Sequence, residues 1–350
     1  MQPSDLAERA GEWLRGNGPQ SDIVMSTRVR LARNVAGYPF TTRLDPGRQA
    51  ELTETLRHHI VDGSIVPETH YFNLNVVQEL ERRLLVERHL ISKEHEEGSG
   101  DRGVVVERRE SIAIMINEED HLRIQVLRSG FDLDDAWTTA HDIDAAIASH
   151  VAYAYSERLG YLTACPTNVG TGMRVSVMLH LPALEMTKQL EKVFHAVAKI
   201  NLAVRGLYGE GTQAAGNFYQ ISNQVTLGKT EESTLREIRG TIPQITQYEQ
   251  RARQILLEQN RQQVEDRVWR AYAMLRAART ISSGETMALL SHLRLGINLG
   301  IIENVDIEAI NQLFVRTLPA HLQILEGREL DSQDRDVARA AFIRRNLGDL

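Results

Sequence analysis

GVVVERR (103–109), SIAIMIN (111–117) and LRIQVL (122–127) are three consecutive runs of mostly aliphatic and β-branched residues. They are short and separated by turns, which is typical of neighbouring antiparallel strands. Upstream, residues 45–62 and 76–91 carry apolar residues at helical spacing. We therefore predict an α+β fold in which helices flank an antiparallel β-sheet.

The segments that follow continue this mixed pattern. Their periodicity predicts a helix over 132–158, a strand over 174–181 and a hairpin over 217–227. KEHEEGSGDRG (93–103) is acidic and contains glycines, which indicates a loop.

The composition changes after Gly228. Residues 230–281 are almost all helix formers, and the segments after them also read as helices. We predict two domains, an α+β domain over 1–228 and an all-helical C-terminal domain over 229–350.

The chain has 350 residues, a net charge of −7 and one cysteine, Cys165. A single cysteine excludes a disulfide within the chain and a zinc site built from cysteines. The negative charge opposes general attraction to nucleic acid, so we expect no direct nucleic-acid binding. The N-terminal residues lack the apolar core of a signal peptide, and no apolar run reaches the roughly 18 residues of a membrane span. We therefore expect a cytoplasmic protein that does not bind membranes.

The common nucleotide-binding motifs do not occur in the sequence. GTGMRVS (170–176) lacks the lysine and the spacing of a P-loop, and Val175 stands where a dinucleotide fingerprint has its third glycine. The His-Arg-Asp and Asp-Phe-Gly signatures of eukaryotic protein kinases are missing. The histidines do not follow a zinc-protease pattern, so we expect no metal held by protein side chains.

Arginines recur at the expected ends of strands. Arg28 and Arg30 of STRVR are two residues apart, so they point to the same side of an extended segment. A guanidinium suits phosphate because its planar fork donates two hydrogen bonds and stays charged. Clustered arginines together with Mg²⁺ can hold the triphosphate of ATP, and the alternative is that each arginine is a solvated surface residue. The candidates are Arg28, Arg30, Arg123, Arg174 and Arg205.

Acidic residues and the cysteine form a second group of candidates. NEED places Glu118, Glu119 and Asp120 side by side. YGEG places Glu210 between two glycines, where the backbone can approach a ligand. Two carboxylates and a thiolate can grip a planar guanidinium, and one carboxylate can act as general base on an N–H. The alternatives are a solvated acidic turn and an inert buried thiol at Cys165.

Four separate segments together resemble the phosphagen (guanidino) kinase family, which includes creatine and arginine kinases. They are STRVRLARN (26–34), NEEDHLR (117–123), CPTNVGTGMR (165–174) and RGLYGEG with ISNQVTLG (205–228), in that family's order and spacing. The resemblance covers residues 20–230. It implies a phosphagen-kinase-like catalytic domain that uses ATP and Mg²⁺ to transfer the γ-phosphoryl group to a guanidine nitrogen.

The resemblance also implies roles for the matched residues. The five arginines would grip the ATP phosphates, Glu119 and Glu210 would orient and deprotonate the guanidinium, and Cys165 would tune that pocket. Which glutamate is the base stays open. Met178 stands where some members have a histidine near the adenine, which predicts more apolar contacts to the base.

Two departures from the family pattern point to a protein substrate. Ordinary members carry a larger helical domain before the first motif, whereas 25 residues precede Ser26 here, and residues 229–350 follow the last motif. The architecture resembles the bacterial members that phosphorylate arginine side chains of proteins. Such an enzyme must leave its guanidinium pocket open to a polypeptide, whereas a small-molecule kinase gains from a closing lid.

The helical domain contains RDVARA (335–340), which resembles a further motif of those bacterial members. Arg335 and Arg339 are four residues apart, so they share a helix face and can clamp a phosphate while Asp336 meets a guanidinium. The resemblance implies an allosteric phosphoarginine site of Arg335, Asp336, Arg339 and Ala340. The alternative is an ordinary charged helix face.

A role in bacterial protein quality control is implied as well. Phosphoarginine would mark proteins for a Clp-type ATPase–protease, and a heat-shock repressor would be one target. A zinc-binding activator protein and a second copy of the chain, in a homodimer or a higher homo-oligomer, are the other expected partners.

Three other functions stay open from the sequence. The chain could phosphorylate a small free guanidino compound such as arginine or creatine. It could be a phosphoarginine-binding adaptor without activity. It could bind nucleic acid through RVRLARN, which the negative net charge disfavours.

Overall fold

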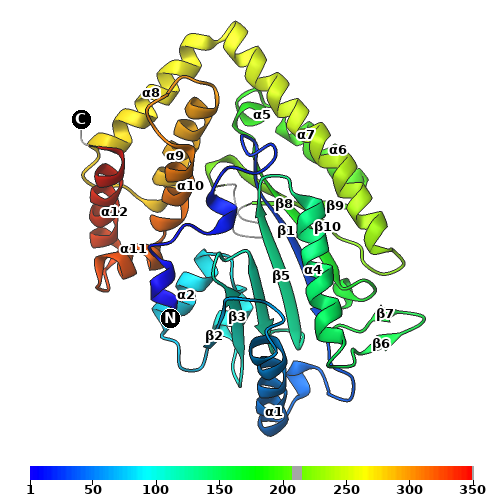
Figure 1. Ribbon diagram of the computed structural model, residues 1–350. Helices are drawn as coiled ribbons and strands as arrows, with labels where there is room; N and C mark the ends of the chain where they lie inside the picture. The colour runs from blue at the N-terminus through cyan, green and yellow to red at the C-terminus, as the bar shows by residue number, and fades with distance from the viewer. Residues whose placement is uncertain (207–214, 349–350) are drawn as a thin grey trace.

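The computed structural model describes residues 1–206 and 215–348. Its centre is an eight-stranded antiparallel sheet in the order β2-β3-β4-β5-β1-β8-β10-β9 (Figure 1). The strands of this sheet are β1 Val24–Arg33, β2 Thr69–Asn73, β3 Gly103–Glu107, β4 Ile112–Ile116, β5 Leu122–Ser129, β8 Met173–His180, β9 Leu202–Gly206 and β10 Phe218–Asn223. A separate hairpin consists of β6 Tyr155–Ser156 and β7 Gly160–Tyr161. The predicted α+β fold is confirmed.

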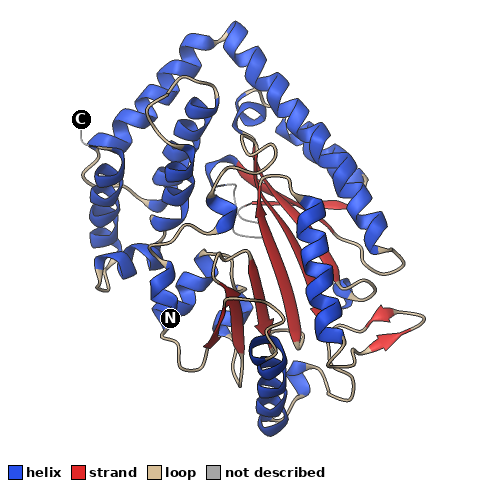
Figure 2. Ribbon diagram, viewed as in Figure 1, coloured by secondary structure: helices blue, strands red, loops and turns tan. Residues whose placement is uncertain are grey.

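Helices flank the sheet and fill the C-terminal part of the chain (Figure 2). They are α1 Pro46–Arg57, α2 Glu79–Glu87, α3 Lys93–Glu97, α4 Leu133–Ala148, α5 Pro182–Met186, α6 Leu190–Lys199, α7 Glu231–Gln259, α8 Arg261–Ala277, α9 Ser283–Asn298, α10 Ile307–Arg316, α11 Pro319–Glu326 and α12 Ser332–Leu347. In the part of the chain that the structure describes, none of the helices is long and apolar enough to cross a bilayer.

One face of the sheet is apolar because alternate residues of its central strands are aliphatic. Val29 and Leu31 of β1, and Ile124 and Val126 of β5, are completely buried. Helix α4 packs along β1 and β5 on this side. Because successive side chains of a strand alternate between faces, the intervening residues of the same strands point to the opposite face.

The long helix α7 begins just after the predicted domain boundary. Thr230 caps it, because its side chain accepts a hydrogen bond from the backbone N–H of Ser233. The helix packs against β8, β10 and α5, whereas α8 to α12 gather on the other side of the molecule (Figure 1). The predicted helical character of the C-terminal region is therefore confirmed, and the division between residues 228 and 229 stays a prediction.

The predicted helix over 132–158 is wrong beyond Ala148, where α4 ends. The chain pairs with the end of β1 instead, because the N–H of Ala154 donates to the carbonyl of Asn34 at 2.7 Å. It then turns into the β6–β7 hairpin. This long-range pairing outweighs the local helical pattern.

Other predicted elements also differ in detail. The predicted loop over 93–103 contains α3, which Ser92 caps by accepting a hydrogen bond from the backbone N–H of His95. The predicted hairpin over 217–227 is a single strand, β10, which pairs with β8 and β9. The helix formers over 230–281 form two helices, α7 and α8, which meet at Asn260.

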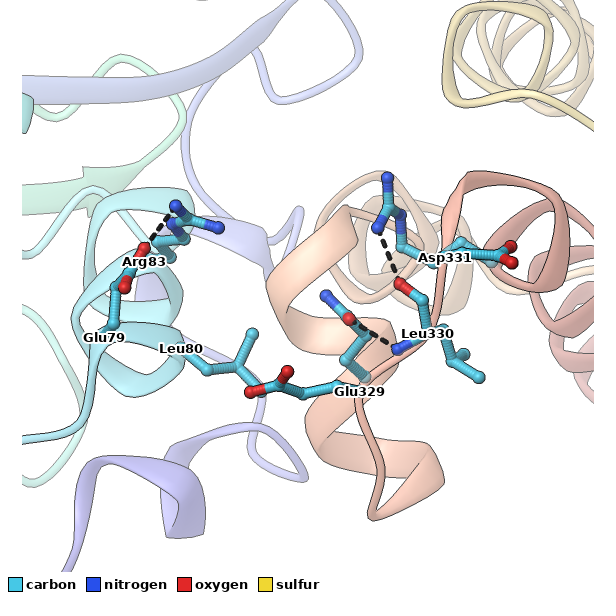
Figure 3. Close-up of a pocket in the computed structure, with 8 residues that line it drawn as sticks. Glu79, Leu80, Arg83, Glu329, Leu330 and Asp331 are labelled. Atoms are coloured by element: carbon cyan, nitrogen blue, oxygen red, sulfur yellow. Dashed lines mark hydrogen bonds and ion pairs between the residues drawn. The ribbon is translucent and has the colours of Figure 1, made fainter.

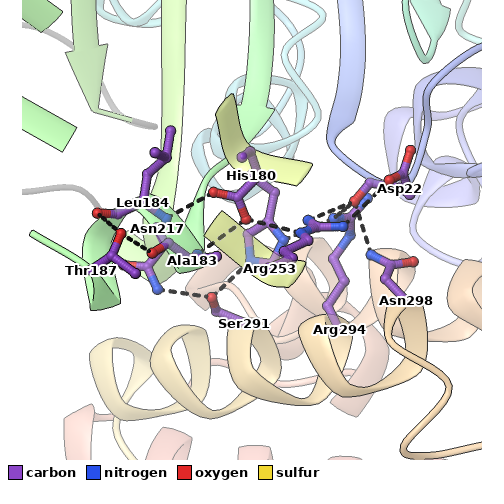
Figure 4. Close-up of polar contacts among 11 residues, drawn as sticks. Asp22, His180, Ala183, Leu184, Thr187, Asn217, Arg253, Ser291, Arg294 and Asn298 are labelled. Atoms are coloured by element: carbon purple, nitrogen blue, oxygen red, sulfur yellow. Dashed lines mark hydrogen bonds and ion pairs between the residues drawn. The ribbon is translucent and has the colours of Figure 1, made fainter. Parts of the chain in front are cut away.

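A buried arginine joins the C-terminal helices to the sheet (Figure 4). Arg294 of α9 donates hydrogen bonds to the carbonyls of Ser21 (2.6 Å) and Asp22 (3.1 Å), to Asn311 Oδ1 (3.1 Å) and to His180 Nδ1 (2.9 Å). Burial, and then the nearby Arg253, lowers the pKa of Arg294 to about 9. Since arginine can only donate, His180 accepts through Nδ1 and donates from Nε2 to Ser291.

We expect Arg294→Ala to lower the free energy of unfolding by about 3 kcal/mol, because it leaves buried acceptors without their donor. Urea denaturation measures this change. The matched control is Arg270→Ala on α8, which removes an exposed ion pair with Asp266 and should change the free energy by less than about 0.5 kcal/mol. Equal effects of the two substitutions would show that the Arg294 contacts do not stabilise the fold.

Candidate active site

The strand register brings four of the candidate arginines onto one face of the sheet. Arg28 and Arg30 lie two residues apart on β1, and Arg30 is directly opposite Arg174 on β8. Arg123 of β5 is opposite Ala32, which is two residues beyond Arg30. Side chains paired across a sheet point to the same face, so all four guanidinium groups project from the face opposite α4.

Arg205 lies on the same face at the edge of the sheet. It is opposite Gln220 of β10, and Gln220 is opposite Met178 of β8. Met178 shares its face with Arg174, because the two are four residues apart on one strand. The structure therefore places all five predicted arginines on one face, which we call the arginine face.

The charges on the arginine face repel one another. Burial, then Arg123 and Arg174, lowers the pKa of Arg28 to about 10. Burial, together with Arg28, Arg123 and Arg174, lowers the pKa of Arg30 well below its ordinary value. The buried Nε of Arg30 donates to no atom of the described residues. A site with unbalanced positive charge and a spare donor is suited to a polyanion.

Neutral side chains orient Arg28. Its Nη2 donates to Gln220 Oε1 at 2.8 Å and its Nε to Ser176 Oγ at 3.2 Å. Both partners lie on neighbouring strands of the same sheet. These contacts fix the guanidinium without neutralising it, so the charge stays available to a ligand.

The two glutamates of NEED differ in their surroundings. Glu118 is buried and accepts from Arg123 Nη1 (2.6 Å), from Ser92 Oγ (2.6 Å) and from the N–H of Glu119 (2.9 Å). Burial alone would raise the pKa of Glu118, but Arg123 and these hydrogen bonds lower it overall. Glu119 is exposed, and partial burial together with Asp120 and Glu118 raises its pKa. A raised pKa suits a general base near neutral pH.

Asp120 links the acidic turn to the cysteine loop. Its Oδ1 accepts from Asn34 Nδ2 at 2.6 Å and from the N–H of Ala164 at 2.7 Å. Glu119 directly precedes Asp120 in the chain, and Cys165 directly follows Ala164. The carboxylate of Asp120 therefore ties the segment that carries Glu119 to the segment that carries Cys165. The Sγ of Cys165 is partly exposed and lies 3.0 Å from Thr167 Oγ1.

The glycines of CPTNVGTGMR allow a close approach of backbone segments. Gly170 and Gly172 have positive φ angles of 114° and 62°. A Cβ at Gly170 would lie 2.4 Å from the carbonyl oxygen of Thr226, and one at Gly172 would lie 2.6 Å from that of Ala32. No other residue type fits these positions without moving the backbone.

Two side chains from other segments hold this loop in place. The Thr226 hydroxyl lies 2.9 Å from the carbonyl of Thr167 and 2.7 Å from that of Val169. Arg33 donates to the carbonyl of Thr171 at 3.0 Å and forms a buried ion pair with Asp144. Thr226 and Arg33 were not among the predicted site residues, although both lie within the quoted motifs.

A small cavity of about 20 Å³ borders the arginine face. Arg28, Trp13, His89 and Met178 are among the residues that line it. The rings of Trp13 and His89 meet edge to face at 5.2 Å. Burial, then Arg28 and Arg30, lowers the pKa of His89 to about 3, so its ring is neutral near pH 7. Trp13 and His89 were not among the predicted site residues, because neither belongs to a quoted motif.

The RDVARA segment lies on α12, away from the arginine face. Arg335 lines an open groove of about 460 Å³ between α2 and the α11–α12 region (Figure 3). Arg339 is buried and donates to the carbonyls of Thr317 (2.8 Å) and Ile281 (2.9 Å) and to the carboxylate of Asp336. Ala340 is completely buried. In this structure Arg335 faces the groove and Arg339 faces the interior, so the joint phosphate clamp stays a prediction.

One predicted catalytic residue, Glu210, lies outside the described residues. The structure reaches Gly206 at the end of β9 and resumes at residue 215. Arg205 is the last of the matched residues before this segment. The role of Glu210 stays a prediction.

The fold and the site together define a guanidino phosphotransferase. The model of the ATP:guanido phosphotransferase C-terminal catalytic domain matches residues 52–252, and the chain belongs to this family. It is an enzyme of the kinase class. A second model, the protein-arginine kinase McsB C-terminal domain, matches residues 261–350.

Curated relatives resemble the chain over its whole length. A protein-arginine kinase of Halothermothrix orenii is 46% identical over 349 residues, which cover 99% of both chains. A protein-arginine kinase of Moorella thermoacetica is 45% identical and covers 97% of this chain and 98% of its own length.

Solved structures show the same fold over two thirds of the chain. A duplicated taurocyamine kinase of Schistosoma mansoni superposes with a TM-score of 0.57 and 30% identity, covering 67% of this chain and 34% of that one. A lombricine kinase has the same TM-score at 24% identity, covering 67% of this chain and 68% of its own, and supports the fold.

We expect Arg30→Met to leave the melting temperature of the ligand-free protein unchanged or higher. The lowered pKa means that folding disfavours the charged form of Arg30, so removing the charge relieves repulsion at neutral pH. The same change should weaken ATP binding about 10- to 100-fold. Thermal shift with and without ATP measures both effects.

The control for this prediction is Arg128→Met. Arg128 also lies on β5, but it pairs with Thr27, projects from the opposite face and contacts Asp135. Its substitution should lower the melting temperature and keep the stabilisation by ATP, about 2.7 kcal/mol at 100 times the Kd. Loss of ATP stabilisation in both variants would contradict a specific role of the arginine face.

Proposed function

We propose that this chain transfers the γ-phosphoryl group of ATP to guanidinium nitrogens of arginine side chains in proteins. The observation that carries the proposal is the arginine face together with the contacts of Asp120, which tie the segment of Glu119 to the segment of Cys165. The full-length similarity to relatives named protein-arginine kinase supports a protein substrate.

In this proposal the arginine face holds the triphosphate. Arg28, Arg30, Arg123, Arg174 and Arg205 contact the phosphate oxygens, and Mg²⁺ enters as part of the Mg·ATP substrate. The adenine lies toward Trp13, His89 and Met178, where an edge-to-face ring pair and a thioether offer apolar contacts. This placement agrees with the expectation that Met178 makes the base contacts more apolar.

The acidic turn then supplies the chemistry at the acceptor. Glu119 accepts a hydrogen bond from a guanidinium N–H and takes the proton as the nitrogen attacks the γ-phosphorus. The N–P bond forms, the bond between the γ-phosphorus and the bridging oxygen breaks, and ADP leaves. Glu210 is the second orienting carboxylate, and Cys165 lines the guanidinium pocket. Positioning and charge neutralisation account for most of the acceleration.

Glu119→Gln tests this assignment against the adjacent Glu118→Gln. We expect Glu119→Gln to lower kcat about 10²- to 10⁴-fold, because it removes the general base. Glu118→Gln should lower kcat less than about 10-fold, since the oxygens of Glu118 already bind Arg123, Ser92 and the Glu119 N–H. The assay is ³²P transfer from ATP to an unfolded, arginine-containing protein.

The pH dependence gives an independent check. A base acts when deprotonated, so kcat/KM should fall as the pH drops through the raised pKa of Glu119. This acidic limb should disappear in Glu119→Gln and stay in Glu118→Gln. Equal loss of activity in both variants, with unchanged pH profiles, would contradict Glu119 as the base.

A kinase of small free guanidino compounds is the second candidate. The similarity to a solved taurocyamine kinase favours it. Offering free arginine and the protein substrate in the same assay distinguishes the two. Acid-labile label located on protein arginine by mass spectrometry supports the first proposal, and label on free arginine alone supports the second.

We further propose the cellular setting that the resemblance implies. The chain acts in the cytoplasm, marks proteins for a Clp-type protease, inactivates a heat-shock repressor and responds to a zinc-binding activator protein as a homodimer or higher oligomer. The similarity to bacterial protein-arginine kinases supports these roles.

The groove at RDVARA is the proposed phosphoarginine site. Arg83 of α2 and Arg335 of α12 line it together with Glu79, Glu329 and Asp331 (Figure 3). Guanidinium groups suit the phosphate of a phosphoarginine, and carboxylates suit its guanidine part. Arg339 supports α12 through its contacts to Thr317 and Ile281.

We expect Arg335→Ala to weaken binding of free phosphoarginine about 10- to 100-fold, because it removes a charge-assisted contact. Isothermal titration calorimetry measures the Kd. Arg345→Ala is the control, since Arg345 lies on the same helix but is exposed and pairs with Glu326. Identical Kd values for the native chain and Arg335→Ala would exclude Arg335 from the site.

A further inference from the structure

The C-terminal end of α2 connects the C-terminal helices to the cavities lined by Trp13, His89 and Met178. We call these cavities the candidate nucleotide pocket. Glu87 is the last residue of α2, and its carboxylate accepts from the backbone N–H groups of Ala320 (2.8 Å) and His321 (2.9 Å). These groups belong to the first turn of α11, where helix N–H groups lack partners within the helix. Glu87 therefore caps α11 from another part of the chain.

The hydrogen-bond pattern fixes the tautomer of His321. Its Nε2 lies 3.1 Å from Arg88 Nη1, and its Nδ1 lies 2.8 Å from Glu87 Oε2. Because arginine can only donate, Nε2 is the acceptor and the proton is on Nδ1, which donates to Glu87. Arg88 is itself buried, and its guanidinium donates two hydrogen bonds to the carboxylate of Glu110. Glu87 thus accepts three hydrogen bonds from α11.

The residue after this pair, His89, lines the small cavity beside the arginine face. His89 has a φ of 59°, a left-handed conformation that non-glycine residues adopt only when their surroundings hold them. Its carbonyl accepts from Gln125 Nε2 at 2.6 Å, and Gln125 is directly opposite Arg30 on the arginine face. Its ring contacts Trp13 beside Arg28.

The start of α11 borders a second cavity, which shares Trp13, His89 and Met178 with the cavity at Arg28. Leu318, the residue before α11, lines this apolar cavity together with Glu87, His89 and Met178. Thr317, which directly precedes Leu318, accepts a hydrogen bond through its carbonyl from Arg339 of α12. Continuous contacts therefore lead from α12 through the α11 N-terminus and Glu87 to His89.

We propose that Glu87 is a positioning residue for the ATP pocket, through which the α11 N-terminus fixes the place of His89. The inference rests on the proposed function, because it takes the pocket at Trp13, His89 and Met178 to bind adenine. It assigns the C-terminal helices a direct part in ATP affinity. A movement of α12 that shifts Thr317 would then change ATP binding at a distance.

Glu249 provides a matched control for Glu87. Glu249 is completely buried, and it caps α5 by accepting from the N–H groups of Ala183 (3.1 Å) and Leu184 (2.9 Å) (Figure 4). It also pairs with Arg253, whereas Glu87 is partly exposed and its third partner is His321. Glu249 does not line the cavities at His89. A general loss of stability from removing a buried helix-capping carboxylate should appear in both variants, whereas an effect on ATP should appear at Glu87 alone.

The experiment compares Glu87→Gln with Glu249→Gln in the full-length chain. ATP affinity is measured by calorimetry, and KM and kcat by phosphoryl transfer. We expect Glu87→Gln to raise both the Kd and the KM for ATP about 2- to 30-fold with kcat changed less than twofold. Glu249→Gln should leave Kd and KM at their native values. An unchanged ATP affinity in folded Glu87→Gln would overturn the inference.

A second pair of variants decides the question if Glu87→Gln does not fold. His321→Asn keeps a side-chain donor near the position of Nδ1, and His321→Leu removes it. We expect a raised Kd for ATP in His321→Leu and a near-native Kd in His321→Asn. Equal Kd values in the two variants would overturn the inference.

The inference and the proposed function can fail separately. If the native chain transfers phosphate and all variants bind ATP equally, the positioning role of Glu87 is wrong and the proposed function stands. If the native chain binds no ATP, both are wrong. If it binds ATP with the expected dependence on Glu87 but transfers nothing to arginine, the proposed reaction alone is wrong.

Discussion

Repulsion among the guanidinium groups of the arginine face is the constraint on which the rest of the structure depends. Folding disfavours the charges of Arg28 and Arg30, as their lowered pKa values indicate. Such groups stay in place only where the surrounding structure is rigid. The rigidity comes from the paired register of β1, β5 and β8 and from the aliphatic face that packs on α4. The apolar face of the sheet thus supports the charged face of the same strands.

The acidic residues near this face cancel only part of its charge. Glu118 forms an ion pair with Arg123 of this face. Asp144 forms an ion pair with Arg33, which projects from the opposite face. Arg28 is held by neutral side chains instead. In the proposed function, a triphosphate meets the charges of Arg28 and Arg30, and the exposed carboxylate of Glu119 serves the acceptor.

Local patterns were sufficient to predict the strands and the shared face of Arg28 and Arg30, because both depend on residues a few positions apart. The pocket residues Trp13 and His89 could not be predicted, since they become neighbours only when distant segments fold together. Helical spacing likewise placed Arg339 near Arg335 but could not show that Arg339 turns inward. That orientation depends on carbonyl acceptors contributed by other segments of the C-terminal region.

The candidate nucleotide pocket draws on both ends of the chain. Trp13 comes from the N-terminal segment, His89 from the end of α2, and Leu318 from the junction of α10 and α11. Removing the C-terminal helices would open the apolar wall and leave the carboxylate of Glu87 without the N–H groups that it binds. In the proposed function, the helical region is therefore part of the catalytic unit. This accounts for a similarity to protein-arginine kinases that extends over the whole chain and does not stop at the sheet.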